Sequence, residues 1–114
     1  MKQYLDSEQT DRLLELGFPG PTSISYLSDV IELDRETPFA EYNYSIGELL
    51  SFFPHIISNE NGRFMLDVFP AIARWHIVYF DRNKENELYR WGGEKELIDL
   101  MFRALVQLKN EKVI

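Results

Sequence analysis

Residues 94–110, EKELIDLMFRALVQLKN, carry a helical repeat that constrains the fold more than any other part of the chain. The expected apolar face consists of Leu97, Met101, Ala104, Leu105 and Leu108, and the polar face of Glu96, Asp99, Arg103, Gln107 and Asn110. This spacing predicts an amphipathic helix of four to five turns. Such a helix needs an apolar surface to cover, and the residues before it must supply that surface.

Three strand-like runs come directly before this helix. They are RFMLDVF (63–69), RWHIVYF (74–80) and ELYRWGG (87–93), and short polar or proline-containing connections join them. In the second run, Trp75, Ile77 and Tyr79 alternate with Arg74, His76, Val78 and Phe80. This alternation predicts a three-stranded antiparallel meander with the C-terminal helix packed on one of its faces.

Two short helices are predicted in the first half of the chain. Residues 7–16 follow a capping Asp6 or Ser7, and Gly17 ends the apolar repeat. In the stretch YSIGELLSFFP, residues 44–54, Ser45 and Glu48 have the spacing of a capping box, and Pro54 ends the helix. Gly47 can instead let a ligand approach the helix N-terminus, but one glycine outside a glycine-rich loop is weak support.

Residues 22–43 carry no clear period. The segment begins with an imperfect alternation in TSISYLSDV and continues as an acidic stretch. We interpret it as an exposed connection with strand character at its start. The whole chain, residues 1–114, is therefore expected to be one α+β domain with two N-terminal helices, a three-stranded antiparallel meander and a C-terminal amphipathic helix on one sheet face.

The composition excludes several classes of site. The chain has no cysteine, so it can form no disulfide, zinc–thiolate or iron–sulfur site. Its N-terminus has no apolar signal region, and no apolar run reaches the ~18 residues of a membrane span. These features predict a cytoplasmic protein without a membrane role.

The net charge of −7 is unevenly distributed along the chain. Residues 1–62 carry three basic and eleven acidic side chains, whereas residues 63–114 carry nine basic and eight acidic ones. An acidic protein is poorly suited to duplex DNA, because phosphate contacts dominate that affinity. A basic protein partner remains open, and so does a surface that is charged only for solubility.

The order of "YSIGELL…FP", "WHIVYF" and "ELIDLMFRALVQLKNE" resembles a group of short uncharacterised bacterial proteins, often encoded in phage or mobile-element regions. The likeness covers roughly residues 7–112 and follows fold-type patterning more than a catalytic motif. It implies a small α+β domain of unknown function, and it assigns no active-site residues.

One candidate ligand site lies on the predicted meander. If Trp75, Ile77 and Tyr79 face the terminal helix, His76 lies on the opposite face. The candidate ligand-binding residues there are Arg63, Arg74, His76, Arg90 and Trp91. Cations beside aromatic rings can hold an anion or single-stranded nucleic acid. A solvated sheet face with paired charges explains the same residues.

No catalytic, cofactor or metal site is predicted. His55 and His76 are the only histidines, and they form no ligand cluster with suitable spacing. DRNKENE, residues 81–87, resembles a calcium loop only superficially, because Asn86 stands where the loop needs glycine. A further hypothesis, a small-molecule enzyme that uses His76, would require a pocket around that histidine.

The leading functional hypothesis is a non-enzymatic interaction or regulatory module. Its partner would bind the open sheet face or an acidic region containing Asp29, Glu32, Asp34, Glu36 and Glu41. The partner can be another protein or a second copy of the chain. The alternative is binding of single-stranded nucleic acid or an anion on the open sheet face.

Overall fold

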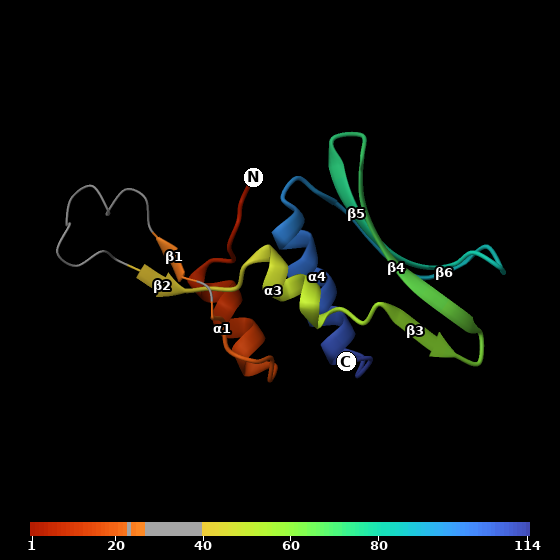
Figure 1. Cartoon of the computed structure of the whole chain (residues 1–114), viewed down its shortest axis with the longest axis horizontal. Helices are drawn as coiled ribbons and strands as arrows, with labels where there is room; N and C mark the ends of the chain where they lie inside the picture. Colours follow the sequence, from red (N-terminus) through yellow and green to blue (C-terminus); the bar gives the residue numbers. More distant parts are fainter. Residues whose placement is uncertain (23, 27–39) are drawn as a thin grey trace.

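The computed structural model describes residues 1–22, 24–26 and 40–114, and these ranges form three helices and two antiparallel sheets. In chain order the elements are α1 (Ser7–Glu15), β1 (Ile24–Tyr26), β2 (Ala40–Tyr42), α3 (Ile46–Phe52), β3 (Ile56–Asn59), β4 (Gly62–Ala71), β5 (Arg74–Asp81), β6 (Asn86–Glu94) and α4 (Leu97–Asn110). The α+β class predicted from the sequence is confirmed. The helices lie between the β1–β2 ribbon and the larger sheet (Figure 1).

The two N-terminal helices begin at the capping residues that the sequence indicates. The Asp6 side chain accepts from the Gln9 amide, and the Gln9 side chain accepts from the Asp6 amide. The predicted box of Ser45 and Glu48 is also present. Each box satisfies amides that have no partner inside the helix, so both short helices start at a defined residue.

The main sheet has four strands in the order β3–β4–β5–β6, so the prediction of three was wrong. Strand β3 is the strand that was not predicted. It pairs with β4 from Ile56 opposite Met65 to Asn59 opposite Gly62. Its four residues are too few to show an alternating pattern, and only His55 separates them from Pro54. Pairing with β4, rather than local sequence preference, makes this segment a strand.

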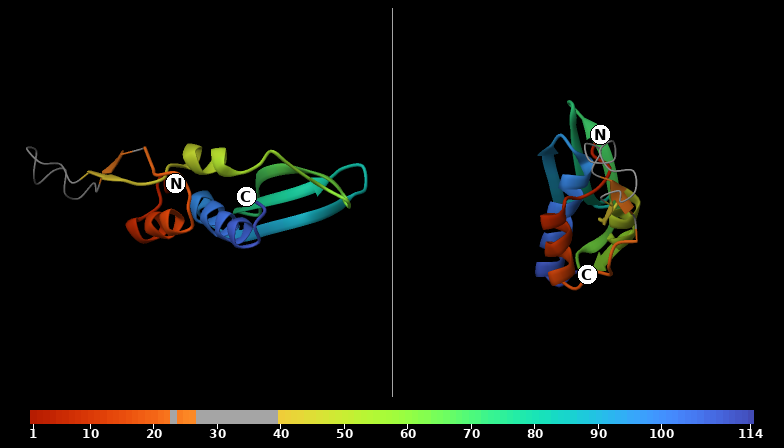
Figure 2. Two further views of the ribbon diagram at one scale, coloured as in Figure 1. Left: turned by 90° about the horizontal axis from the view of Figure 1, so that it is seen from below. Right: turned by 90° about the vertical axis from the view of Figure 1, so that its left-hand side faces the viewer.

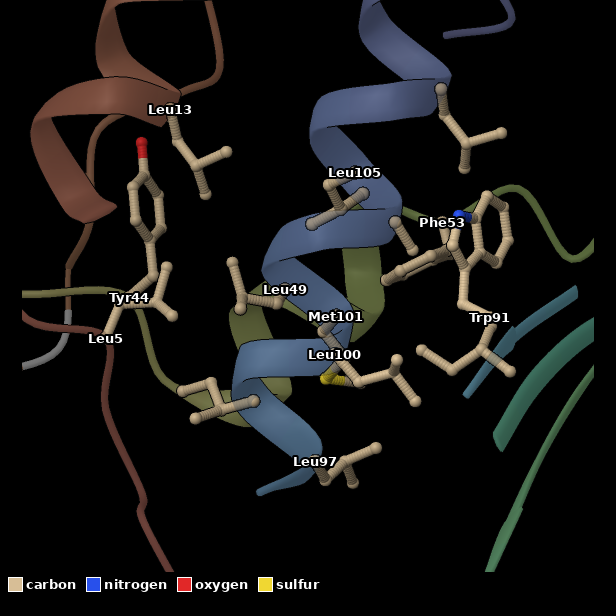
Figure 3. Close-up of a cluster of buried hydrophobic side chains, with 14 of the residues drawn as sticks. Leu5, Leu13, Tyr44, Leu49, Phe53, Trp91, Leu97, Leu100, Met101 and Leu105 are labelled. Atoms are coloured by element: carbon tan, nitrogen blue, oxygen red, sulfur yellow. The ribbon is translucent and has the colours of Figure 1, made fainter. Parts of the chain in front are cut away.

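Helix α4 is the central helix of the fold, which differs from its predicted place as a cover on one sheet face. Strand β6 extends to Glu94, so the helix begins at Leu97 and not at residue 94. Its buried residues include Ile98 and Leu100 in addition to the predicted apolar face. Figure 3 shows the reason, because α4 lies between Trp91 of the sheet on one side and Leu13 and Tyr44 on the other.

The elements form layers that share one core. Figure 2 shows the ribbon β1–β2 at one end, the sheet at the other and the helices between them. The fully buried side chains come from the helices, the segments before α1 and α3 and the main sheet, and they include Leu5, Leu13, Tyr44, Leu49, Phe64, Ile77, Tyr79, Ile98 and Leu105. As predicted from the alternation in β5, Ile77 and Tyr79 face the helices.

Tyr79 joins the sheet to the segment after α3. Its side chain is fully buried, and its hydroxyl donates to the Pro54 carbonyl at 2.7 Å. Burial raises the pKa of this phenol. We expect Tyr79→Phe to lower the free energy of unfolding by about 0.5–1.5 kcal/mol, since the Pro54 carbonyl loses its donor.

Chemical denaturation of Tyr79→Phe and of a matched variant, Tyr89→Phe, tests this expectation. The Tyr89 hydroxyl donates to the Glu111 carboxylate at an exposed position, so its loss is expected to change stability little. Equal losses in the two variants would show that the buried bond is not what holds this segment.

Asp81 holds two hairpin turns at the same end of the sheet. One carboxylate oxygen accepts from the Arg63 amide at 3.1 Å, and the other accepts from the amides of Asn83 and Lys84 at 2.9 and 3.3 Å. Burial alone would raise the pKa of Asp81, but these hydrogen bonds and the charge of Lys84 outweigh it and hold the pKa below its ordinary value. The ionised form therefore stabilises the fold.

This lowered pKa predicts a loss of stability in acid. The contribution of Asp81 is complete above the ordinary carboxyl pKa of about 3.9 and is lost as the pH falls through the lower value of the folded state. In Asp81→Asn, this part of the acid dependence is expected to disappear. Urea unfolding of both proteins between about pH 6 and about pH 2.5 measures it. Identical pH profiles would contradict the assignment.

Candidate interaction surface

The outer face of the main sheet is the surface turned away from α4, and in the described part of the chain no helix or strand covers it (Figure 1). Its central residues are Met65, Asp67 and Phe69 of β4, His76, Val78 and Phe80 of β5, and Glu87 and Arg90 of β6. Cross-strand pairing fixes this set, because partners in neighbouring strands share a face. Half of these side chains are apolar.

A hollow of about 220 Å³ lies in the outer face. It is lined by Asp67, Phe69, Val78, Phe80, Glu87 and Arg90. Val78 is only 3% exposed although no other layer covers it, because the surrounding side chains shield it. The hollow therefore has an apolar floor and a charged rim. Register shifts in the pairing of β5 with β6 accompany the bend of the sheet, as expected for bulges.

His76 stacks on Phe69 beside the hollow. The two rings are 5.4 Å apart between centroids and 17° from parallel. Within the described residues, the buried Nδ1 of His76 has no hydrogen-bond partner. It faces Gly92 on β6, where an added Cβ would lie 2.8 Å from Nδ1. The glycine therefore makes room for the imidazole, and the ring is held between two strands. An enzyme based on His76 gains no support from this arrangement, because no acid or base lies beside Nδ1.

Arg90 is on the outer face as predicted, but its charge is already paired. Its Nε donates to both carboxylate oxygens of Glu87, at 2.9 and 3.0 Å. The hydrogen bond with Arg90 lowers the pKa of Glu87, and the same bond raises that of Arg90. Arg90 is therefore a weaker candidate for binding a free anion than the sequence suggests.

Three other charges on this side of the sheet have no ion-pair or hydrogen-bonding partner for their side chains among the described residues. They are Arg63, Asp67 and Arg74. Arg63 lies at the β3 end of the sheet, in a separate depression with Met65 and Arg82. Arg74 lies at the opposite end, next to the turn between β4 and β5. The structure therefore does not gather the predicted cations around one point.

Trp91 is the predicted site residue that the structure places elsewhere. It pairs with Ile77, so it shares the inner face with the core and is 5% exposed. Its Nε1 donates to the Gln107 side chain of α4, and its ring stacks on Tyr89. Trp91 and Tyr89 therefore cannot supply stacking rings on the outer face. Phe69 provides a ring there that was not predicted, and its alternation with Met65 and Asp67 along β4 was the available signal in the sequence.

Two stretches of the sheet's edges are blocked against the addition of another strand. At the β6 edge, Arg103 of α4 donates to the Gly92 carbonyl at 2.7 Å and pairs with Glu94. At the β4 edge, the part beyond β3 contains Pro70, which has no amide to donate. Proline and a covering side chain are common means of blocking edge pairing. These two stretches are therefore poor places for a partner strand to pair.

Ile72 is the functional candidate that the sequence reading did not identify. It lies in the two-residue turn between β4 and β5 and is 96% exposed. Its φ is +53°, and that of Ala73 is +57°. Glycine or asparagine usually occupies such turns, and a β-branched residue there is unusual. The sequence predicts a connection between residues 69 and 74, but the apolar Ile72 and Ala73 give no sign that it is a tight two-residue turn.

The remaining predicted residues do not form a site in the described structure. Asp29, Glu32, Asp34 and Glu36 lie outside the described residues, and Glu41 belongs to β2. His55 is exposed before β3. Among the described residues, no group of three or more histidine, aspartate or glutamate side chains is placed to hold a metal ion. No helix in the described ranges is long and apolar enough to cross a membrane.

Comparison with known proteins assigns no function to this surface. The chain matches no protein-family model, no curated protein and no solved structure. The functional argument therefore depends on the outer face itself.

Proposed function

We propose that the protein is a non-enzymatic protein-interaction module and that the outer face is its contact surface. The observation that carries this proposal is the hollow itself, whose apolar floor of Phe69, Val78 and Phe80 is covered by no helix or strand of the described chain. The resemblance to phage- and mobile-element-encoded bacterial proteins and the absence of cysteine favour a place in the bacterial cytoplasm.

The composition of the outer face suits a protein partner. An apolar centre with a charged rim is the usual organisation of a protein interface. Met65 is 52% exposed beside the hollow, which extends the apolar surface beyond it. The hollow itself is open and shallow, whereas small-molecule sites enclose most of their ligand. Exposed apolar surface on a folded domain commonly marks an interaction site.

Capture of binding proteins from the native host tests the proposal with a matched pair of variants. Met65→Glu places a charge on the outer face, and Leu50→Glu places the same charge at a similarly exposed position on α3. We expect wild type and Leu50→Glu to capture the same partner, and Met65→Glu to lose it. Circular dichroism confirms that both variants fold. Equal capture by the two variants would contradict the proposal.

Binding of an anion or single-stranded nucleic acid is the second candidate. It is favoured by the stacked Phe69 and His76 rings and by the unpaired Arg74 two residues before His76. The net charge of −7 opposes it. This candidate predicts salt-sensitive binding of a short oligonucleotide that weakens in Arg74→Ala, measured by fluorescence anisotropy. Unchanged affinity in that variant would remove the candidate.

A further inference from the structure

We infer that the partner of the outer face is a second copy of this chain, with Ile72 of each copy seated in the hollow of the other. This inference rests on the proposed function and names its partner. Three features support it: an exposed apolar tip at one end of the sheet, a hollow with an apolar floor in the outer face, and opposite charges without partners on this side of the sheet. Each feature has a complement on the face itself, which is what a two-fold interface requires.

The conformation and exposure of Ile72, the tip of the β4–β5 turn, lower the stability of the isolated chain. Ile72 adopts a left-handed backbone conformation that is unfavourable for a β-branched residue, and its side chain is 96% exposed. No burial within the described chain offsets this strain. Strained backbone positions often coincide with functional ones. An apolar side chain presented in this way gains most when a partner covers it.

The hollow can receive such a side chain. Its floor is formed by Val78 with Phe69 and Phe80 beside it, so an entering isoleucine would contact apolar atoms on several sides. Its volume of about 220 Å³ has room for one branched aliphatic side chain. A protruding side chain also allows close packing, because two concave faces placed together would otherwise leave a void between them.

The strand register places tip and hollow at a spacing that a two-fold axis can join. At about 3.3 Å per residue, Val78 lies about 18 Å from the turn at Ile72. Phe69 pairs with His76 between these two points. An axis across the strands halfway between the turn and Val78, close to the Pro70–Trp75 pair, would place the tip of each copy over Val78 of the other. The Phe69–His76 stacks of the two copies would then lie next to this axis.

The unpaired charges fit the same arrangement. Arg74 follows the tip by two residues, and Asp67 pairs with Val78 in the register of the sheet and lines the hollow. When the tip of one copy enters the hollow of the other, Arg74 comes beside Asp67 of the second copy. The symmetry repeats the pair, so two ion pairs form between opposite charges.

The expected dimer is reversible. The sheet has four strands spaced about 4.8 Å apart, and the longest has 10 residues at about 3.3 Å each. The face is therefore smaller than the ~800 Å² that each partner usually contributes to a stable interface. We therefore expect an equilibrium between monomer and dimer that shifts with protein concentration. Sedimentation equilibrium over a concentration series measures this association for wild type and variants.

Ile72→Asn separates the dimer contact from the fold. Asparagine tolerates the left-handed conformation, so the variant is expected to unfold at the same or a higher temperature than wild type. It removes the apolar tip, so it is expected to weaken the dimer at least tenfold. A variant that is as stable as wild type and dimerises equally well would overturn the inference.

A charge exchange tests the pairing of Arg74 with Asp67. Asp67→Arg or Arg74→Asp alone places like charges opposite each other in the dimer, so each is expected to weaken association. The double variant Asp67→Arg/Arg74→Asp restores opposite charges and is expected to recover it. A double variant weaker than both single ones would contradict the arrangement.

The dimer and the proposed function can fail separately. Wild type that remains monomeric at every concentration overturns the inference about a second copy, while the capture experiment with Met65→Glu still decides whether the outer face binds another protein. A dimer that is unaffected by both Ile72→Asn and the charge exchange also overturns the inference, because it must then form through another surface.

Discussion

Leu105→Ala is expected to lower the free energy of unfolding by about 2–5 kcal/mol, as is typical for deletion of a buried leucine side chain. Leu105 is fully buried on α4, the helix that packs against both the sheet and the N-terminal elements (Figure 3). The cavity left by its side chain would lie at the junction of these layers. Their fixed positions limit how far the structure can close around it.

Leu14→Ala is the matched control. Leu14 is 43% exposed on α1, so the same change of side chain is expected to shift stability by no more than about 0.5 kcal/mol. Urea denaturation followed by circular dichroism measures both variants. A loss for Leu105→Ala as small as that for Leu14→Ala would mean that α4 is not the centre of the core.

Gly92→Ala is expected to lower the free energy of unfolding by about 1–3 kcal/mol, as overpacking does. The new methyl group would lie 2.8 Å from Nδ1 and 3.1 Å from Cε1 of His76. The imidazole would have to turn away, which breaks its stacking on Phe69. The variant therefore disturbs the outer face and the stability of the sheet together.

A double-mutant cycle isolates this contact. His76→Ala removes the ring that the methyl group would strike, so Gly92→Ala is expected to cost much less when introduced into His76→Ala than into wild type. Strictly additive effects in the cycle would show that the imidazole does not occupy the space beside Gly92.

Local signals in the sequence predicted the parts of the fold that depend on neighbouring residues. The capping box of Ser45 and Glu48 is such a signal, because both partners lie within one helical turn. The alternation in β5 is another, since it depends only on which residues of one strand meet the core. Both were read from the sequence and found in the structure.

The parts that were missed depend on pairing between distant segments. The register of β5 with β6 decides that Trp91 shares a face with Ile77, and no residue within β6 reveals this register. Strand β3 exists because β4 pairs with it. The buried surface of α4 is wide because layers pack against two sides of the helix. The helical repeat alone does not show that there are two such layers.

The candidate surface was predicted in outline and changed in detail. His76, Arg74 and Arg90 do lie on the face opposite the helices, as the alternation of β5 and the pairing of Val78 with Arg90 require. Recognising the ion pair between Arg90 and Glu87 required the three-dimensional structure. The exposure of Ile72 required it as well, because the predicted connection between the two strands does not show which of its residues are exposed.

An NMR dilution series of isotope-labelled protein tests most directly whether the outer face is the contact surface and a second copy its partner. We expect amide shifts that change with concentration at Asp67, Phe69, Ile72 and Val78, while those of α1 stay constant. Such a map would place the association on the outer face. Spectra that do not change over the series, or changes confined to α1 and the edge of β6, would contradict the account.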